Sequence, residues 1–253
     1  IPLTLLSYQF DYLLSGTNPA WYHFHSLVLH ILNAALVVWV LKLLTKNTWV
    51  SLLTGVLFLI HPLNTEAVAW ASGRKDLLST LFFLLSTGFY LQKQKRLSVA
   101  TFALGLLAKV SILTLPAVLL LIDYFQGRKI DRNALQEKIP YIVATLIFAA
   151  IAWYGKTGVI DSSTTIEKLL IAPLSTVFYL QKILIPTGLA VIYPLTGSID
   201  VLSTRVLVPI ALSIGLLILG LTHIRKNKYI FFGLVFFAIT LSPSLLNFSK
   251  GDY

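Results

Sequence analysis

The feature of this sequence that most constrains its fold is a series of long apolar runs with few or no charges. Each run approaches or reaches the roughly 20 residues that a helix needs to cross a bilayer. None alternates as a barrel strand does, so helices alone satisfy the backbone polar groups in lipid. With 57% hydrophobic and 12% charged residues, the chain is predicted to be an all-α, polytopic membrane bundle. The clearest runs are residues 27–44, 77–91, 139–154, 206–221 and 230–241.

The net charge of +10 resides in short basic clusters between the apolar runs. These clusters carry no interleaved aromatic platform, which argues against nucleic acid as a partner. We interpret them as four loops that face the cytoplasm, because Lys and Arg accumulate on that side of membrane proteins. The chain has no cysteine, which excludes disulfides and thiol chemistry. The clusters are Lys42 and Lys46; Lys93, Lys95 and Arg96; Arg128, Lys129, Arg132 and Lys138; and Arg225, Lys226 and Lys228.

The chain must cross the membrane between each basic cytoplasmic cluster and the next far-side loop. This alternation predicts about seven to eight membrane helices. Residues 97–125 begin and end beside basic clusters, so they are predicted to form a hairpin of two short helices with its apex near Lys109. The other predicted spans are residues 23–44, 49–60, 77–92, 139–154, 205–222 and 229–246.

Residues 169–185 have two interpretations. They form either a further span or an amphipathic helix in the far interface. The basic sequence HIRKNK that follows residue 222 favours the interfacial helix, because a further span would disturb the alternation of sides.

The densest set of ionisable residues is the predicted far-side loop from residue 61 to residue 76. It holds His61, Glu66, Arg74, Lys75 and Asp76. An acid, a proton carrier and two cations suit an anionic ligand that needs both charge neutralisation and a general base. Arg74 stands out because a guanidinium grips phosphate oxygens in a fixed fork. The structural alternative makes Asp76 a helix N-cap and the two cations an interfacial anchor.

Three other polar residues lie within or beside apolar runs. His23 and His30 are seven residues apart on one face of the first predicted span, which is not a metal-ligand spacing. We predict an interhelical hydrogen bond for His30 and a site near the far interface for His23. Lys109, at the predicted apex, either snorkels to the interface or binds a lipid phosphate.

Three segments together resemble a known family of membrane enzymes. They are HPLNTEAVAWASGRKDLLSTLFFLLS, GTNPAWYHFHSLVLHILNA and LLAKVSILTLPAVLLLIDYF. They are similar to the membrane domain of the transmembrane-and-tetratricopeptide-repeat protein O-mannosyltransferases. Those proteins belong to the GT-C superfamily of polyprenyl-phosphate-sugar-dependent glycosyltransferases. The resemblance covers most of the chain, in order.

The resemblance implies an enzyme that transfers a sugar, commonly mannose, from a polyprenyl-phosphate donor to a hydroxyl of a polypeptide or other acceptor. The reaction is expected on the far side of a plasma membrane or of the endoplasmic reticulum, among membrane lipids. The implied catalytic residues are Glu66 and His61, and the implied donor-phosphate ligands are Arg74, Lys109 and His23. The family motif also matches His30, Pro62, Thr65 and Asp76.

The chain departs from the family pattern in three places. The main catalytic base is expected in a far-side loop that precedes Ile1. Val110 follows Lys109 where relatives have an acid, and Ser26 stands where they tend to have Asn. We therefore expect one membrane domain, residues 1–253, that is an internal fragment lacking its first helix, first far-side loop and downstream repeats.

The predicted chemistry is an inverting transfer in which the leaving phosphate needs charge neutralisation. A metal is not required by the sequence, and a carboxylate site would prefer Mg or Mn to Zn. Two other classes remain open. A transporter or lipid flippase would place its ionisable residues at the bilayer midplane, and a non-catalytic membrane scaffold would need none.

Overall fold

The computed structural model describes residues 1–155, 165–190, 193, 203–224 and 226–245, with the backbone alone for 165–169. All regular elements among these residues are helices, which confirms the all-α prediction. The chain divides into two compact units, Ile1–Trp153 and Tyr154–Tyr253, and each is described by itself. The single domain expected from the sequence stays a prediction.

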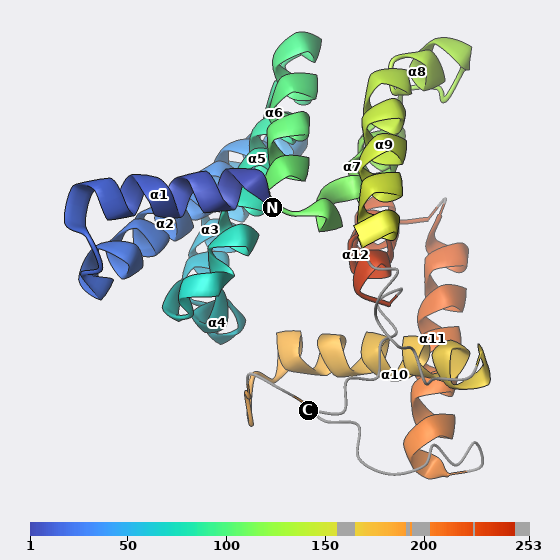
Figure 1. Cartoon of the computed structure of the whole chain (residues 1–253). Coiled ribbons are helices and arrows are strands. Elements are labelled where there is room, and N and C mark those ends of the chain that lie inside the picture. Colours follow the sequence, from blue (N-terminus) through green and yellow to red (C-terminus); the bar gives the residue numbers. More distant parts are fainter. Residues whose placement is uncertain (156–164, 191–192, 194–202, 225, 246–253) are drawn as a thin grey trace. The chain divides into compact units, whose positions relative to one another are not determined.

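The first unit consists of long helices joined by short helical turns (Figure 1). Residues 97–125 form two helices separated by an extended residue, Lys109, and a 3-10 turn, as predicted, whereas their crossing of the membrane as a hairpin stays a prediction. In order, the elements are α1 (Pro2–Ser15), α2 (Pro19–Thr45), α3 (Thr48–Ile60), η1 (Pro62–Asn64), α4 (Thr65–Ala69), η2 (Ala71–Gly73), α5 (Arg74–Leu91), α6 (Lys95–Ala108), η3 (Val110–Thr114), α7 (Leu115–Phe125), α8 (Arg132–Gln136) and α9 (Ile139–Gly155).

Local sequence sets the ends of the long helix α2. Asn18 caps its first turn by accepting a hydrogen bond from the Ala20 N–H at 3.1 Å, and Pro19 occupies the first helical position. At the other end Lys46 adopts a left-handed conformation with φ of 58°. Asn47 then accepts from the Val50 N–H at 3.1 Å and caps α3. The two helices are therefore joined by a tight turn.

Small and hydroxyl-bearing residues bring the helices of the first unit together. At Gly88 of α5, a Cβ atom would come within 1.9 Å of the Trp39 ring on α2, so only glycine permits this approach. The Tyr141 hydroxyl on α9 donates to Ser98 Oγ on α6 at 2.6 Å, and Ser98 Oγ lies 3.1 Å from Ser86 Oγ on α5. Hydrogen bonds between side chains thus link three helices where lipid would give no hydrophobic driving force.

Helix α1 runs crosswise to α6 in Figure 1. The Thr4 hydroxyl donates to the Ala108 carbonyl at the end of α6, at 3.2 Å. Thr4 and Asp11 are the buried residues of α1, whereas Leu6, Phe10 and most of its other large apolar side chains are exposed. The helix is thus polar on its inner side and apolar on its outer side.

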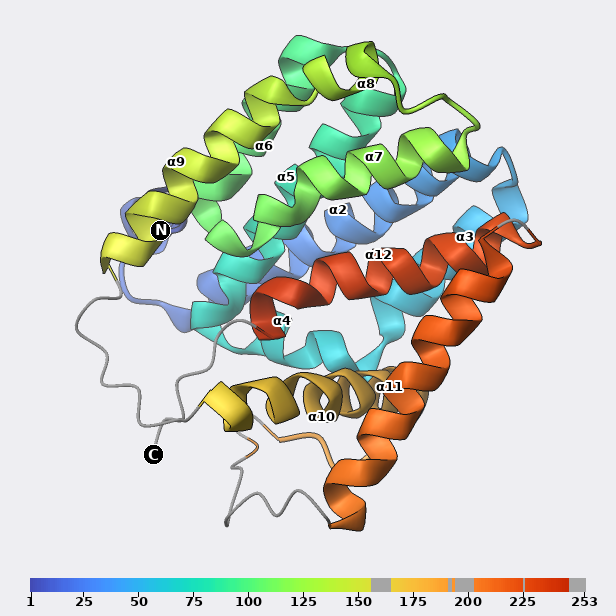
Figure 2. The same cartoon turned by 90° about the vertical axis from the view of Figure 1, so that its right-hand side faces the viewer.

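The described residues of the second unit form three helices, and α10 contacts both of the others. Figure 2 shows α11 and α12 as a hairpin. Near the end of α10, Lys182 Nζ donates to the Thr187 carbonyl at 2.5 Å, and its ammonium lies 5.5 Å from the ring centre of Phe178. The elements are α10 (Thr165–Leu184), α11 (Thr204–His223) and α12 (Lys228–Leu245).

Three of the described helices, α2, α11 and α12, are long and apolar enough to cross a membrane. A fourth crossing results if α3 is joined to Pro62–Ala69, a pair bent by 51°. Val110–Phe125, Ile139–Gly155 and Leu170–Leu184 are shorter apolar helices. The membrane-helix character is therefore confirmed for several elements, while seven to eight crossings and the placement of residues 169–185 stay predictions.

Candidate functional site

The segment from residue 61 to residue 76 is not the polar loop that the sequence predicted. It folds into η1, α4 and η2, and Arg74 already begins helix α5. A Cβ atom at Gly73 would lie 2.8 Å from the Ala67 carbonyl oxygen, so glycine allows the chain to double back against α4. Gly73 is also the N-cap of α5 and no side chain caps this helix, which corrects the alternative that made Asp76 the N-cap.

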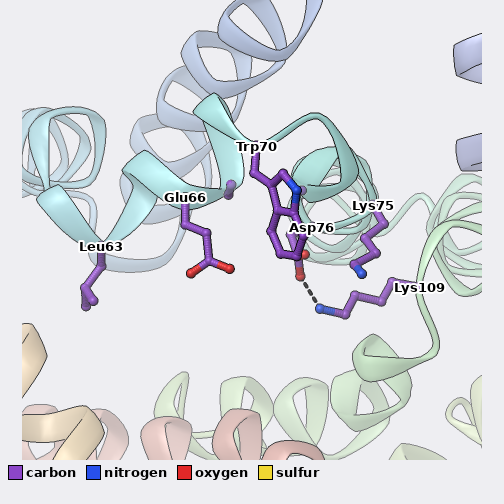
Figure 3. A pocket seen from close by; sticks show the side chains of 8 residues that line it. Leu63, Glu66, Trp70, Lys75, Asp76 and Lys109 are labelled. Atoms are coloured by element: carbon purple, nitrogen blue, oxygen red, sulfur yellow. Dashed lines mark hydrogen bonds and ion pairs between the residues drawn. The ribbon is translucent and has the colours of Figure 1, made fainter. Parts of the chain in front are cut away.

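These short turns form one wall of an open pocket of about 410 Å³ (Figure 3). Lys109, the extended residue between α6 and η3, contributes its side chain to the pocket lining. The pocket contains both charge signs and one large aromatic ring. Its lining residues are Leu63, Glu66, Ala67, Trp70, Gly73, Lys75, Asp76 and Lys109.

Lys109 forms an ion pair with Asp76 across the pocket. The sequence left Lys109 without a carboxylate partner because Val110 follows it; the fold supplies that partner from α5, 33 residues earlier. The backbone N–H of Lys109 donates to the Gly105 carbonyl at 2.9 Å, which holds the residue at the end of α6. The side chains of Lys109 and Asp76 are 33% and 40% exposed, so a ligand can reach both.

Glu66 and Lys75 complete the charged lining. Within the described part of the chain, neither side chain has a hydrogen bond or ion pair. Figure 3 shows the Glu66 carboxylate on one side of Trp70 and the two lysine side chains on the other. The pocket thus has an anionic end and a cationic end.

Arg74 lies outside this pocket lining and is 1% exposed. Its guanidinium pairs with Asp11 of α1 through Nη1, and Nη2 donates to the Tyr22 carbonyl at 2.6 Å. The ring of Tyr8 lies 4.9 Å from the guanidinium carbon. The Arg74 guanidinium is therefore already in contact with three groups of the protein. Its role as a phosphate ligand stays a prediction.

Asp11, Tyr8 and His25 form a cluster with Arg74 that sequence reasoning missed. Arg74 pairs with Oδ2 of the Asp11 carboxylate, and His25 Nδ1 pairs with Oδ1. The Tyr8 hydroxyl donates to the Ala71 carbonyl at 2.6 Å, and burial raises the pKa of Tyr8, an effect that Arg74 opposes. A signal was present, because Asp11 is the first acid of the chain and stands in an apolar segment where it needs a partner.

The three histidines singled out from the sequence occupy separate places. His30 is buried and its Nε2 hydrogen bonds with the Leu59 carbonyl at 3.0 Å, which confirms the predicted interhelical bond. His61 caps η1, where its Nδ1 accepts from the Leu63 N–H at 3.3 Å. His23 is exposed, and neither it nor His61 lines the pocket.

The described residues contain no group of three or more His, Asp and Glu side chains placed to hold a metal ion. Glu66 and Asp76 both line the pocket, but Asp76 is engaged by Lys109. The arrangement therefore offers a ligand one unengaged ammonium group, Lys75, one unengaged carboxylate, Glu66, and the accessible Lys109–Asp76 ion pair.

Comparison with known proteins finds relatives for part of the chain. Protein O-mannosyl-transferase Tmtc2 of Drosophila melanogaster is 32% identical over 152 residues, which are 54% of this chain and 16% of that protein. Human protein O-mannosyl-transferase TMTC3 is 40% identical over 83 residues, 33% of this chain and 9% of the relative. For TMTC1 of Mus musculus the identity is 38% over 86 residues, 34% of this chain and 9% of the relative.

The chain therefore spans less than a fifth of the length of these relatives. No family model matches it, and no solved structure does. The matched proteins are nevertheless all named protein O-mannosyl-transferases, at identities of 32% to 40%. The resemblance to the transmembrane-and-tetratricopeptide-repeat protein O-mannosyl-transferases that the sequence motifs predicted is thereby confirmed.

Proposed function

We propose that this chain is part of a multi-pass membrane glycosyltransferase of GT-C type. The enzyme transfers a sugar, mannose by analogy with its relatives, from a polyprenyl-phosphate donor to a Ser or Thr hydroxyl of a polypeptide on the non-cytoplasmic side. The names of the relatives support mannosyl transfer to protein. The observation that carries the proposal for this chain is the two-ended charged pocket formed by residues 63–76 and Lys109.

The cationic end of the pocket binds the donor phosphate in this proposal. Lys75 is unpaired among the described residues, and Lys109 exchanges Asp76 for a phosphate oxygen when the donor enters. Each charge-assisted hydrogen bond of this kind contributes about 1.5–3 kcal/mol. Phosphate leaves readily once its charge is neutralised, so two ammonium groups supply what the leaving group needs.

The anionic end receives the acceptor. The hydroxyl oxygen attacks the anomeric carbon, the bond from that carbon to the phosphate oxygen breaks, and the electron pair stays with the lipid phosphate. The hydroxyl proton passes to a carboxylate base of the full-length protein. Glu66 orients the hydroxyl by accepting its hydrogen bond, and His61 keeps the turn before α4 in place by capping η1.

Arg74 holds α1 against α5 and so sets the position of Lys75 and Asp76, which follow it directly. Loss of Arg74 is therefore expected to weaken donor binding by displacing these two residues. His23 is exposed and lies outside the pocket lining, and its role as a donor-phosphate ligand stays a prediction.

Binding of polyprenyl-phosphate-mannose to the full-length natural protein in nanodiscs tests the proposal. The variant Lys75→Gln/Lys109→Gln is expected to bind at least about tenfold more weakly. The matched control is Lys46→Gln/Lys129→Gln, which removes the same charge from two exposed lysines outside the pocket.

Equal donor binding by the pocket variant and its control would contradict the assignment of Lys75 and Lys109 as the phosphate site. If the wild-type protein binds no donor, the proposed glycosyltransferase function is wrong. Lipid translocation in proteoliposomes without sugar transfer would favour a transporter or flippase. If the protein shows neither translocation nor sugar transfer, the non-catalytic scaffold is favoured.

A further inference from the structure

Trp70 is the large aromatic ring of the pocket. It is 50% exposed, and Figure 3 shows its indole between the Glu66 carboxylate and the Lys109 ammonium group. The indole has no hydrogen bond or ring contact with any other described residue. A ring in this position has a free face and a free N–H donor inside a pocket that is otherwise lined by charges.

The backbone of Trp70 is fixed although its side chain is free. Its N–H donates to the Glu66 carbonyl at 2.9 Å, and its carbonyl accepts from the Gly73 N–H at 2.8 Å. Trp70 ends α4 in an extended conformation, with φ of −87° and ψ of 121°. The indole is therefore presented by a braced turn, with Glu66 one helical turn before it.

Trp70 differs from the exposed tryptophans that fit an interfacial aromatic belt. Trp49 and Trp153 are about 80% exposed, and neither lines the pocket. Trp70 shares its pocket with Glu66 and Lys109, and a belt residue needs no such charged neighbours.

We propose that Trp70 is the platform on which the glycosyl ring of the donor stacks. One face of a pyranose carries C–H groups that pack on an aromatic ring, while its hydroxyls remain free to hydrogen bond at the edges. This inference rests on the proposed function, because it takes the donor as the ligand of the pocket. It makes Trp70 the residue that distinguishes a glycosylated lipid phosphate from a bare one.

The position of the platform also orients the reaction. An inverting transfer requires the nucleophile and the leaving group on opposite sides of the anomeric carbon. With the ring stacked on Trp70, the phosphate lies at Lys75 and Lys109, and the acceptor hydroxyl lies at Glu66. The two reactants are thereby held on opposite sides of the sugar, which lowers the entropic cost of the transfer.

Binding of two ligands to the full-length protein in nanodiscs tests the proposal. The ligands are polyprenyl phosphate and polyprenyl-phosphate-mannose. Trp70→Leu is expected to weaken binding of the mannosylated ligand by about tenfold while leaving the bare phosphate unchanged, and Trp70→Phe is expected to lie between. Trp49→Leu is the matched control, because it removes an exposed tryptophan of the same unit outside the pocket.

Unchanged binding of the bare phosphate by Trp70→Leu shows that the variant is folded. An equal loss for both ligands would overturn the platform in favour of a general structural role, and no loss for either would overturn it outright. Failure of the proposed function gives a different result, because the wild type then binds no mannosylated ligand, or Lys75→Gln/Lys109→Gln binds both ligands as well as the wild type does.

Discussion

Two Lys–Asp pairs in the first unit join the same chemical groups and differ in their access to solvent. Lys109 and Asp76 are 33% and 40% exposed at the pocket. Lys138 and Asp123, by contrast, are 0% and 2% exposed. A ligand can therefore replace a partner in the first pair, whereas the second pair is part of the packing.

The buried pair is also fully hydrogen bonded. The Tyr90 hydroxyl donates to the Asp123 carboxylate at 2.7 Å, and Lys138 contacts both groups. Further out, Glu137 accepts from Arg128 and from Lys95, each at 2.7 Å. We counted Lys138 among the basic loop residues, but it serves to join the ends of α5, α7 and α9.

The largest expected effect comes from breaking the buried pair. Lys138→Met leaves the Asp123 carboxylate without its closest cation, and removal of one partner from a buried pair typically costs about 3–5 kcal/mol. We expect a large fall in the thermal unfolding midpoint of the full-length protein in detergent. Adding Asp123→Asn should recover part of the loss, because no unpaired charge remains. A fall no larger than that of the exposed neighbour Lys129→Met would contradict this assignment.

The second effect concerns the turn that shapes the open pocket. Gly73→Ala puts a methyl group 2.8 Å from the Ala67 carbonyl oxygen, and such overpacking costs about 1–3 kcal/mol. Because Trp70 and Lys75 flank this turn, donor binding should weaken as well. Gly233→Ala, where nothing lies within 4 Å, is the control for unfolding. Unchanged stability and binding in Gly73→Ala would mean that α4 and η2 move apart without consequence for the pocket.

Breaking the open pair should have a smaller effect on stability. Lys109→Met removes a partly exposed ion pair, and pairs of this kind contribute about 0–1 kcal/mol. Its unfolding midpoint in detergent should therefore stay near that of the wild type, in contrast to Lys138→Met. A loss as large as that of Lys138→Met would make the two pairs equivalent and remove the distinction between them.

The smallest expected effect is the response of the outer ion pairs to pH. The hydrogen bond from Arg128, followed by that from Lys95, lowers the pKa of Glu137 from 4.5 to about 2, against burial. The folded protein therefore binds this proton less readily than the unfolded chain does. The resulting stability is complete above pH 4.5 and is lost as the pH falls toward 2.

Because Arg128 and Lys95 are 37% and 55% exposed, this contribution should be no more than about 1 kcal/mol. Thermal unfolding of the wild type and of Glu137→Gln between pH 6 and pH 3 measures it. The difference between the two proteins should shrink as the pH falls, and a constant difference would assign the effect to packing.

Helix positions were predictable because continuous apolar runs and helix caps are local features of the sequence. The break at Lys109 lies where it was predicted, and α3 begins at Thr48, one residue before the predicted span 49–60. Helix α2 begins at Pro19, four residues before the predicted span 23–44. The short turns between His61 and Arg74 were missed, since polar residues in a segment this brief give no periodicity.

The pairing of charges was much less predictable than the helices. Glu66, Asp76 and Lys109 were singled out from the sequence, and the fold brings them into one pocket. Asp11 was missed as the partner of Arg74, because the two residues are 63 positions apart and only tertiary contact joins them. Which of several cations meets which acid depends on helix packing, and no local pattern records it.

The pairing of Asp11 with Arg74 has a consequence for the order in which the protein is made. Asp11 is synthesised 63 residues before its cation, so α1 emerges from the ribosome with an unpartnered acid on its inner side. It can pair with its cation only after α2, α3 and the start of α5 have been synthesised. Ribosome-bound chains that end before Arg74 should therefore leave α1 open to protease, and slightly longer chains should protect it.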